Sequence, residues 1–203
     1  MSKKPIIVFE GIEGTGKSHH IKKIANFLKK KKIRFIQIRE PGGSNNSEKI
    51  RKLILNNKSN FNKETDLLLY LSARSENLEL IKKNIGKKII LIDRFSDSTI
   101  AYQHYGMGVN LKFIKNINNH LLKDIKVSFT FLNTVSHSNM RKRLSERKKL
   151  NRYDRFENNF YNKVQGGFLK LLKANPSRYM KIDSNKNIIL NETKILNKIK
   201  KLI

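Results

Sequence analysis

Apolar residues form short continuous runs that are separated by longer stretches of mixed character. The runs occupy residues 5–9, 33–38, 88–92, 127–132 and 179–182. Continuous apolar runs of this length are typical of strands that are buried on both faces of a parallel sheet. Each run therefore predicts one such strand.

The stretches between the runs show helical periodicity. Ile21, Ile24, Ala25 and Leu28 return at intervals of three and four positions, which places them on one face of a helix. Thr65 is a candidate N-cap for a long helix. Further helical patterns cover residues 45–57, 64–85, the stretch from the third run to about 122 with a break at 106–108, 135–146, a segment ending at Ala174, and 190–202.

Strands that alternate with helices predict an α/β fold in which helices cover both faces of a parallel sheet. The chain has 203 residues, enough for one sizeable core, and no internal repeat or low-complexity linker divides it. We therefore expect a single domain over residues 1–203.

Composition indicates the cellular compartment in which the protein acts. The sequence has no cysteine, which excludes disulfides and thiolate metal sites. The first apolar run is too short for a signal peptide, and no run approaches the length of a membrane span. These features predict a soluble, cytoplasmic protein without a membrane partner.

The formal net charge of +28 raises the question of a nucleic-acid partner. Clustered Lys and Arg favour such a partner, because they neutralise phosphates and release counterions. Here the lysines are spread over nearly every predicted helix and occur with an excess of Asn and Ile, as codon drift in an AT-rich genome produces. We therefore expect no dedicated nucleic-acid face, although the positive field attracts anionic substrates.

The strongest motif follows the first apolar run directly. Residues 11–18 match G-x-x-x-x-G-K-[ST] between a predicted strand and a predicted helix. Backbone N–H groups of such a loop and the positive end of the following helix bind polyphosphate. The motif predicts a nucleoside triphosphate site in which Lys17 reaches the β- and γ-phosphates and the Ser18 hydroxyl is a ligand of Mg²⁺. The predicted nucleotide-binding residues are Gly11, Ile12, Glu13, Gly14, Thr15, Gly16, Lys17 and Ser18.

Three other segments follow predicted strands, at the edge of the sheet where α/β folds bind ligands. They are Arg39–Gly43, Asp93-Arg94 with the residues after it, and the basic segment 147–155, and each has an Arg beside an acid. A site that joins two phosphate groups needs such cations, because they offset the repulsion between donor and acceptor.

Taken together, four segments resemble bacterial thymidylate kinases: Phe9–Ser18, Arg-Glu-Pro-Gly-Gly at 39–43, Ser-Ala-Arg at 72–74, and Asp-Arg-Phe-Ser-Asp-Ser-Thr-Ile-Ala-Tyr-Gln at 93–103. They occur in order along essentially the whole chain. The resemblance implies a three-layer α/β/α P-loop fold with a five-stranded parallel sheet and a short basic lid at about 147–157. It also implies Mg²⁺-dependent transfer of the ATP γ-phosphate to dTMP, and a homodimer formed through helices that include 64–85.

The same resemblance implies roles for individual side chains. Arg39 and Arg94 bind the acceptor phosphate, and Arg74 reaches a carbonyl edge of thymine. Tyr70 stacks on the base where the family usually has Phe, although its place in an apolar stripe also fits a core residue. The remaining implied contacts are Thr99 and Gln103 at the base (or as braces of a helix), Tyr102 beside the 2′ position, and Glu13 near the sugar 3′-OH or the metal.

The expected chemistry requires no proton-abstracting side chain, because the acceptor phosphate is largely dianionic near neutral pH. Catalysis then consists of positioning and charge neutralisation by Lys17, Mg²⁺ and arginines such as Arg94. Asp93 and Glu10 are candidates for water-mediated Mg²⁺ contacts beside Ser18.

The resemblance also implies that the lid supplies an arginine, since Thr15-Gly16 offers no cation within the phosphate loop. Two registers fit the family pattern. Residues 151–154 keep the spacing to the following helix, whereas residues 154–157 keep the residue identities. They place the catalytic cation at Arg152 or at Arg155, with Arg152 slightly favoured.

Two other functions remain open at this point. A deoxynucleoside kinase of the same architecture needs a carboxylate base after the second strand, where Glu40 stands. A basic nucleic-acid-binding P-loop protein uses the net charge directly, but it leaves the motifs at 39–43 and 93–103 unexplained.

Overall fold

Five parallel strands form one sheet at the centre of the computed structural model, which describes residues 4–203. Along the sheet they lie in the order β2-β3-β1-β4-β5, and every neighbouring pair is parallel. The strands are β1 (Ile6–Glu10), β2 (Phe35–Arg39), β3 (Ile89–Asp93), β4 (Phe129–Thr134) and β5 (Tyr179–Asp183). Each predicted strand is confirmed to within two residues at either end.

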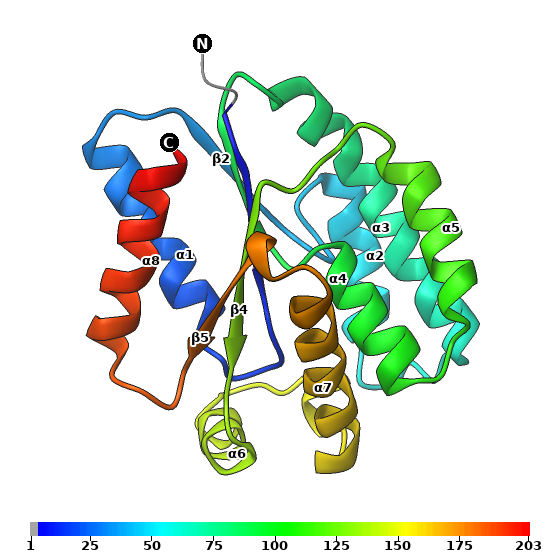
Figure 1. Cartoon of the computed structure of the whole chain (residues 1–203). Coiled ribbons are helices and arrows are strands. Elements are labelled where there is room, and N and C mark those ends of the chain that lie inside the picture. Colours follow the sequence, from blue (N-terminus) through cyan, green and yellow to red (C-terminus); the bar gives the residue numbers. More distant parts are fainter. Residues whose placement is uncertain (1–3) are drawn as a thin grey trace.

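Helices cover both faces of the sheet and complete three layers (Figure 1). Helices α1 (Lys17–Lys30) and α8 (Ile188–Leu202) lie on one face, where Ile21, Ile24 and Leu28 pack against Ile7 and Phe9. The opposite face is covered by α2 (Asn45–Leu55), α3 (Lys63–Asn84), α4 (Ser96–Thr99), α5 (Leu111–Leu122) and α7 (Asn158–Ala174). The predicted three-layer α/β/α arrangement is confirmed.

The long helix α3 begins slightly earlier than the sequence pattern indicated. Its N-cap is Asn62, whose side-chain oxygen accepts a hydrogen bond from the Thr65 backbone N–H at 2.8 Å. The prediction of Thr65 as the cap was therefore wrong, because Asn62 caps the helix three residues earlier and Thr65 lies within its first turn.

The segment after β3 is helical but irregular, as the break at 106–108 predicted. Helix α4 runs directly into the π-helical segment η1 (Ile100–Gly106), whose wider turn is closed by the Met107 N–H donating to the Tyr102 carbonyl at 3.0 Å. Single π-helical turns of this kind are frequent at functional sites. The wide turn directs side chains of η1 toward the carboxyl ends of the strands.

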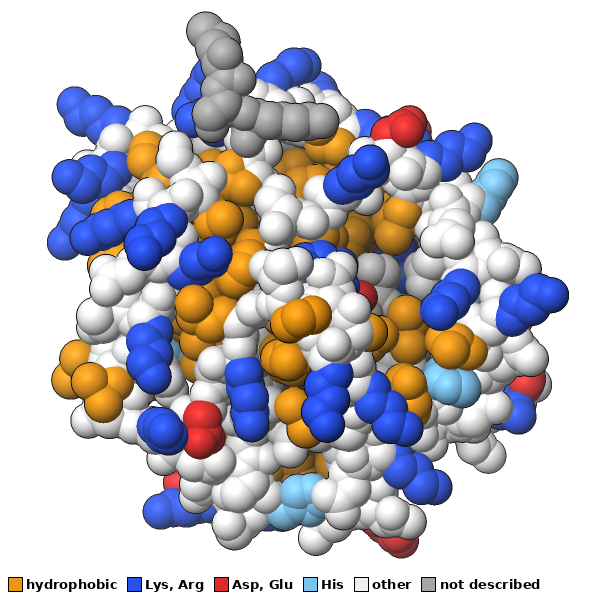
Figure 2. Space-filling view, viewed as in Figure 1, with side chains coloured by type: hydrophobic (Ala, Val, Ile, Leu, Met, Phe, Trp, Pro, Cys, Tyr) orange, Lys and Arg blue, Asp and Glu red, His pale blue; other side chains and the backbone are white. Residues whose placement is uncertain are grey.

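Three short elements complete the chain: α6 (His137–Ser145) and the 3₁₀ turns η2 (Tyr153–Arg155) and η3 (Pro176–Arg178). Lys and Arg side chains are distributed across the whole face seen in Figure 2, between apolar and uncharged side chains. Within residues 4–203, no helix combines the length and the apolar character that crossing a membrane requires.

Candidate active site

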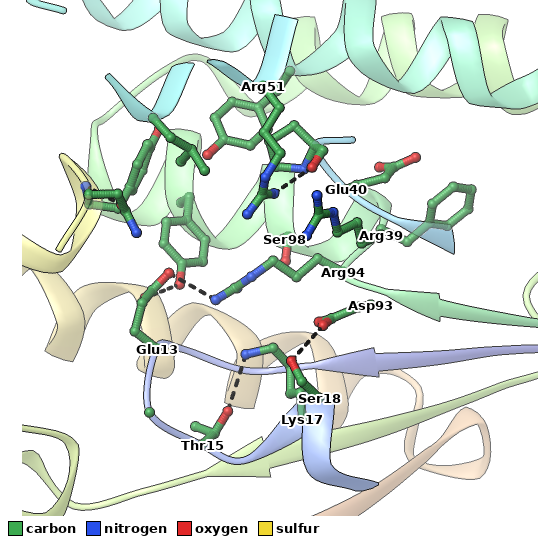
Figure 3. A pocket seen from close by; sticks show the side chains of 18 of the residues that line it. Glu13, Thr15, Lys17, Ser18, Arg39, Glu40, Arg51, Asp93, Arg94 and Ser98 are labelled. Atoms are coloured by element: carbon green, nitrogen blue, oxygen red, sulfur yellow. Dashed lines mark hydrogen bonds and ion pairs between the residues drawn. The ribbon is translucent and has the colours of Figure 1, made fainter. Parts of the chain in front are cut away.

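A cavity of about 600 Å³ opens at the carboxyl ends of β1, β2 and β3. The phosphate loop forms its floor, and the loop after β2, the residues after β3, α3, η1 and the segment after α6 form its walls (Figure 3). Its volume lies within the usual range for small-molecule sites. The structure therefore brings together all four segments that the sequence placed at this edge of the sheet.

Glycines are required in the phosphate loop for two different reasons. At Gly11 the φ angle is 134°, and a Cβ there would lie 2.1 Å from the Asn133 carbonyl oxygen. Gly16 precedes α1 with a φ angle of 78°, a left-handed conformation that glycine adopts without steric cost. This geometry presents the helix N-terminus to the cavity, as an anion site requires.

The Lys17 ammonium lies within the loop itself. Its Nζ donates to the carbonyl oxygens of Gly11 and Ile12 at 2.9 and 2.8 Å, and to Thr15 Oγ1 at 3.2 Å. Burial, together with repulsion from Arg94, lowers the pKa of Lys17 to about 8. A cation at this position is available to polyphosphate at neutral pH.

Ser18 and Asp93 meet at the start of α1 and the end of β3. The Ser18 hydroxyl donates to Asp93 Oδ2 at 3.1 Å (Figure 3). Hydroxyl and carboxylate oxygens are ligands that Mg²⁺ accepts, and this ion is commonly held by one or two such groups plus substrate phosphates and water. The Ser18–Asp93 pair fits a cation of this type by its donor chemistry. Residues 4–203 contain no group of three or more His, Asp or Glu suited to a metal.

Glu10 does not join this pair. Its carboxylate is fully buried and accepts hydrogen bonds from the Phe95 N–H at 2.8 Å, the Ser98 N–H at 3.2 Å and the Ser98 hydroxyl at 2.5 Å. Burial and the neighbouring Asp97 raise the pKa of Glu10 to about 7. The expectation of a water-mediated contact between Glu10 and Mg²⁺ disagrees with this arrangement, because both carboxylate oxygens are engaged in fixing the start of α4.

Arg94 extends over the phosphate loop from a strained backbone position, with a φ angle of 66°. Its Nη2 donates to Glu13 Oε1 at 2.9 Å, and Glu13 Oε2 accepts from the Tyr102 hydroxyl at 2.6 Å. Burial alone would raise the pKa of Glu13, but Arg94 and Lys17 outweigh it and lower that pKa. Glu13 therefore stays ionised and holds Arg94 toward the cavity.

Three guanidinium groups reach into the space above the loop. Arg94 has a buried Nη1 with no hydrogen-bond partner among the described residues, and Arg39 and Arg51 lie beside it (Figure 3). Arg39 is held by Glu48 at 2.9–3.1 Å, and Arg51 donates to the Pro41 carbonyl at 2.5 Å. Arg51 was not predicted as a site residue, although it directly follows an inward position of the predicted helix 45–57.

The far wall of the cavity combines aromatic and polar side chains. Tyr70 and Tyr153 meet edge to face, with ring centroids 5.9 Å apart. Thr99 is 1% exposed, and its Oγ1 has no partner within the part of the chain described. Gln103 Nε2 donates to Asp66 at 3.1 Å. The structure therefore places Tyr70, Thr99 and Gln103 together at the cavity, as predicted for a base site.

Arg74 lines the same wall but is more restrained than expected. Its Nε and Nη2 both lie 2.8 Å from Glu40 Oε2, and its Nη1 donates to Asn118 at 2.7 Å. Burial outweighs this pairing and raises the pKa of Glu40. A carboxylate bound in this way is poorly placed to act as the general base that a deoxynucleoside kinase needs.

The lid and the end of α6 place different cations at the cavity from those predicted. Arg152 pairs with Asp66, and Arg155 is exposed; neither lines the cavity. Arg147 and Arg143 do line it, and Arg143 donates to a backbone carbonyl of the phosphate loop at 2.8 Å. The assignment of the catalytic cation to 152 or 155 therefore disagrees with this arrangement, because the Asp66 carboxylate holds Arg152 outside the cavity.

A parallel sheet of this order, a phosphate loop after β1 and a second cationic pocket opposite it define a P-loop kinase that acts on a phosphorylated acceptor. Comparisons with known proteins narrow this class. The family model described as thymidylate kinase matches residues 9–195, and the chain belongs to the thymidylate kinase family.

Individual relatives agree with this assignment along nearly the whole chain. A thymidylate kinase of Wolbachia pipientis wMel is 39% identical, covering 95% of this chain and 98% of the relative. One of Mycoplasma capricolum is 38% identical over 90% of this chain and 88% of its own length. The crystal structure of thymidylate kinase from Ehrlichia chaffeensis superposes with a TM-score of 0.78 at 28% identity, covering 97% of this chain and 98% of that one.

Proposed function

We propose that the chain transfers the γ-phosphate of ATP to dTMP, giving dTDP, and that dTMP binds in the cavity opposite the phosphate loop. As a member of the thymidylate kinase family, it is an ATP-dependent phosphotransferase that uses Mg²⁺. The observation that carries the placement is Arg94, which lines the cavity opposite the loop and has at Nη1 a buried donor without a partner among the described residues. A buried donor of this kind is costly unless a ligand satisfies it.

The phosphate loop binds ATP, the phosphate donor. Backbone N–H groups and Lys17 bind the β- and γ-phosphates of ATP, and the Ser18 and Asp93 oxygens, which are 3.1 Å apart, would hold Mg²⁺. When bound, Mg²⁺ supplies positive charge to the phosphate oxygens and orients them. Asp93 thus keeps its predicted role, whereas Glu10 is assigned to the structure of α4.

The acceptor side uses the arginine group. Arg94, Arg39 and Arg51 bind the phosphate of dTMP, and Glu13 orients Arg94. The acceptor oxygen is already ionised, so charge neutralisation and alignment suffice for the transfer. Arg147 is the lid cation that approaches the transferred group, because it lines the cavity and its side chain is 40% exposed.

Thymine binds at the far wall of the cavity. Tyr70 stacks on thymine, while Thr99, Gln103 and Arg74 face its polar edges; Tyr102, whose hydroxyl is held by Glu13, crowds the 2′ position of the sugar. Thr99 Oγ1 supports this assignment, since the described residues offer it no other partner.

We further propose a homodimer formed through α3 and α5. Most of the apolar excess of α3 is used within the chain, because Leu67 and Leu71 pack with Val109 and Ile114. Leu68 on α3 and Phe113 on α5 stay 50% and 44% exposed, and they support a contact with a second copy. Both substrates are water-soluble metabolites, which supports action in the cytoplasm.

A coupled assay of ADP formation with four acceptors tests the proposed function. We expect turnover of dTMP, weaker turnover of dUMP and little turnover of UMP or thymidine. UMP carries the 2′-hydroxyl that Tyr102 crowds, and thymidine lacks the phosphate that the arginines bind. Turnover of thymidine without turnover of dTMP would establish the deoxynucleoside kinase instead.

A further inference from the structure

One buried carboxylate connects three parts of the molecule that meet at the cavity. Asp66, in the first turn of α3, is only 1% exposed. Its Oδ1 pairs with Arg152, while its Oδ2 accepts hydrogen bonds from the Tyr153 hydroxyl at 2.5 Å and from Gln103 Nε2 at 3.1 Å. A single side chain thus joins α3, η1 and the turn η2 within the lid.

These contacts depend on one another. Burying a carboxylate is unfavourable unless a cation and hydrogen-bond donors compensate it. Arg152 supplies the charge with a side chain that is itself only 14% exposed, and its guanidinium lies over the rings of Phe61 and Tyr153 at 5.6 and 5.0 Å. Loss of any member leaves another buried polar group unsatisfied, so the three elements hold their positions together.

The network extends within the lid from Arg152 and Tyr153 to Arg147 at the cavity. Arg147, which lines the cavity, donates to Asp154 at 2.7 Å, and Asp154 also accepts from the Asn151 N–H at 3.0 Å. Asp154 directly follows Tyr153 in the chain. The position of Arg147 therefore depends on the same turn that Asp66 anchors.

The network also reaches the acceptor side. Gln103 lines the cavity, and the ring of Tyr153 stands edge-on to both Tyr70 and Tyr102, with centroid distances of 5.9 and 5.8 Å. Tyr70, Tyr102, Gln103 and Tyr153 all line the cavity, so an acceptor that fills it would contact them and limit the space into which Tyr153 can move.

We propose that Asp66 is a positioning residue that couples binding of the acceptor nucleotide to ordering of the lid. The inference rests on the proposed function, because it takes Gln103 and Tyr70 as parts of the base site. With the acceptor bound, the contacts of Asp66 with Tyr153 and Arg152 are held and the lid stays closed. By linkage, the acceptor also raises the affinity for the phosphate donor, and the donor raises that for the acceptor by the same factor.

Limited proteolysis with trypsin tests the coupling, because the lid carries three exposed cleavage sites at Arg147, Lys148 and Lys149. We expect saturating dTMP to slow cleavage at these sites about tenfold in the wild-type protein, a typical coupling factor. In Asp66→Asn the slowing falls to less than about twofold. Glu64→Gln is the matched control: it removes an exposed carboxylate from the same turn of α3 and keeps the wild-type protection.

Direct binding of dTMP, measured by calorimetry on the same samples, separates the possible failures. A wild-type protein that does not bind dTMP refutes the proposed function. Binding of dTMP without protection of the lid refutes the coupling, and so does full protection in folded Asp66→Asn. If Asp66→Asn does not fold, Tyr153→Phe decides the question, since it removes only the hydroxyl that Asp66 binds. Protection in Tyr153→Phe is expected to fall about threefold, and unchanged protection refutes the coupling.

Discussion

Replacing Arg94 by Lys isolates the contribution of its guanidinium group. Both residues are cationic and both have a Cβ, so the substitution keeps the charge and the backbone conformation at φ 66° comparable. Lysine, however, lacks the fork in which Nη2 donates to Glu13 at 2.9 Å and Nη1 remains as a second donor without a partner among the described residues. The variant therefore loses the second donor rather than the positive charge.

The expected loss of activity follows from the one hydrogen-bond donor that Arg94→Lys removes. A hydrogen bond to a charged group contributes about 1.5–3 kcal/mol, which corresponds to a factor of about 10 to 150 in a rate or binding constant. We expect kcat/KM for dTMP to fall by this factor in Arg94→Lys. The Michaelis constant for ATP should change by less than about threefold, because Lys17 and the loop bind the donor.

A coupled assay of ADP formation, with dTMP varied at saturating ATP, measures the effect. Arg155→Lys is the matched control, since Arg155 is exposed and does not line the cavity, and its kcat/KM should equal that of the wild type. An Arg94→Lys enzyme within twofold of wild type would show that Nη1 does not bind the acceptor phosphate.

Four further outcomes are expected. Gly11→Ala places a Cβ 2.1 Å from the Asn133 carbonyl oxygen, so it should abolish ATP binding and lower the free energy of unfolding by about 3 kcal/mol in chemical denaturation. The pKa of Lys17 is near 8 in the free protein, so the ammonium that binds phosphate loses its proton as the pH rises. ATP affinity should therefore fall about fivefold from pH 8 to pH 9. In Lys17→Arg, which stays charged, ATP affinity should not change over this range. Thr99→Val should raise the KM for dTMP about fivefold without lowering the melting temperature, because the hydroxyl has no partner among the described residues; an unchanged KM would remove Thr99 from the base site. Leu68→Asp should convert a dimer to a monomer in sedimentation, whereas sedimentation unchanged from wild type would exclude this face.

The fold was largely predictable from local patterns. Continuous apolar runs mark strands that are buried on both faces, and Ile89–Ile92 are indeed fully buried in β3. The phosphate loop was predictable for a similar reason, since its chemistry lies in adjacent residues. Where two polar residues compete locally, as Asn62 and Thr65 do for the start of α3, the pattern did not decide between them.

The contacts within the site were less predictable, because they join distant parts of the chain. The Glu13–Arg94 pair exists only because β1 and β3 are neighbours in the sheet. The capture of Arg152 by Asp66 depends on how α3 packs beside the lid, and no spacing along the chain indicates it. The contacts of Glu10 were not predictable for the same reason, since the N–H groups that engage its carboxylate follow another strand.

The central claim is that Arg94 and its neighbours hold a phosphorylated acceptor in line with the phosphate loop. A crystal structure of the protein with adenosine and thymidine joined by a chain of phosphates, which mimics both substrates at once, tests it most directly. We predict that Arg94 Nη1 lies within hydrogen-bond distance of the thymidine-side phosphate, with thymine between Tyr70 and Thr99. A thymidine moiety bound outside this cavity, or an Arg94 that makes no contact with phosphate, would contradict the account.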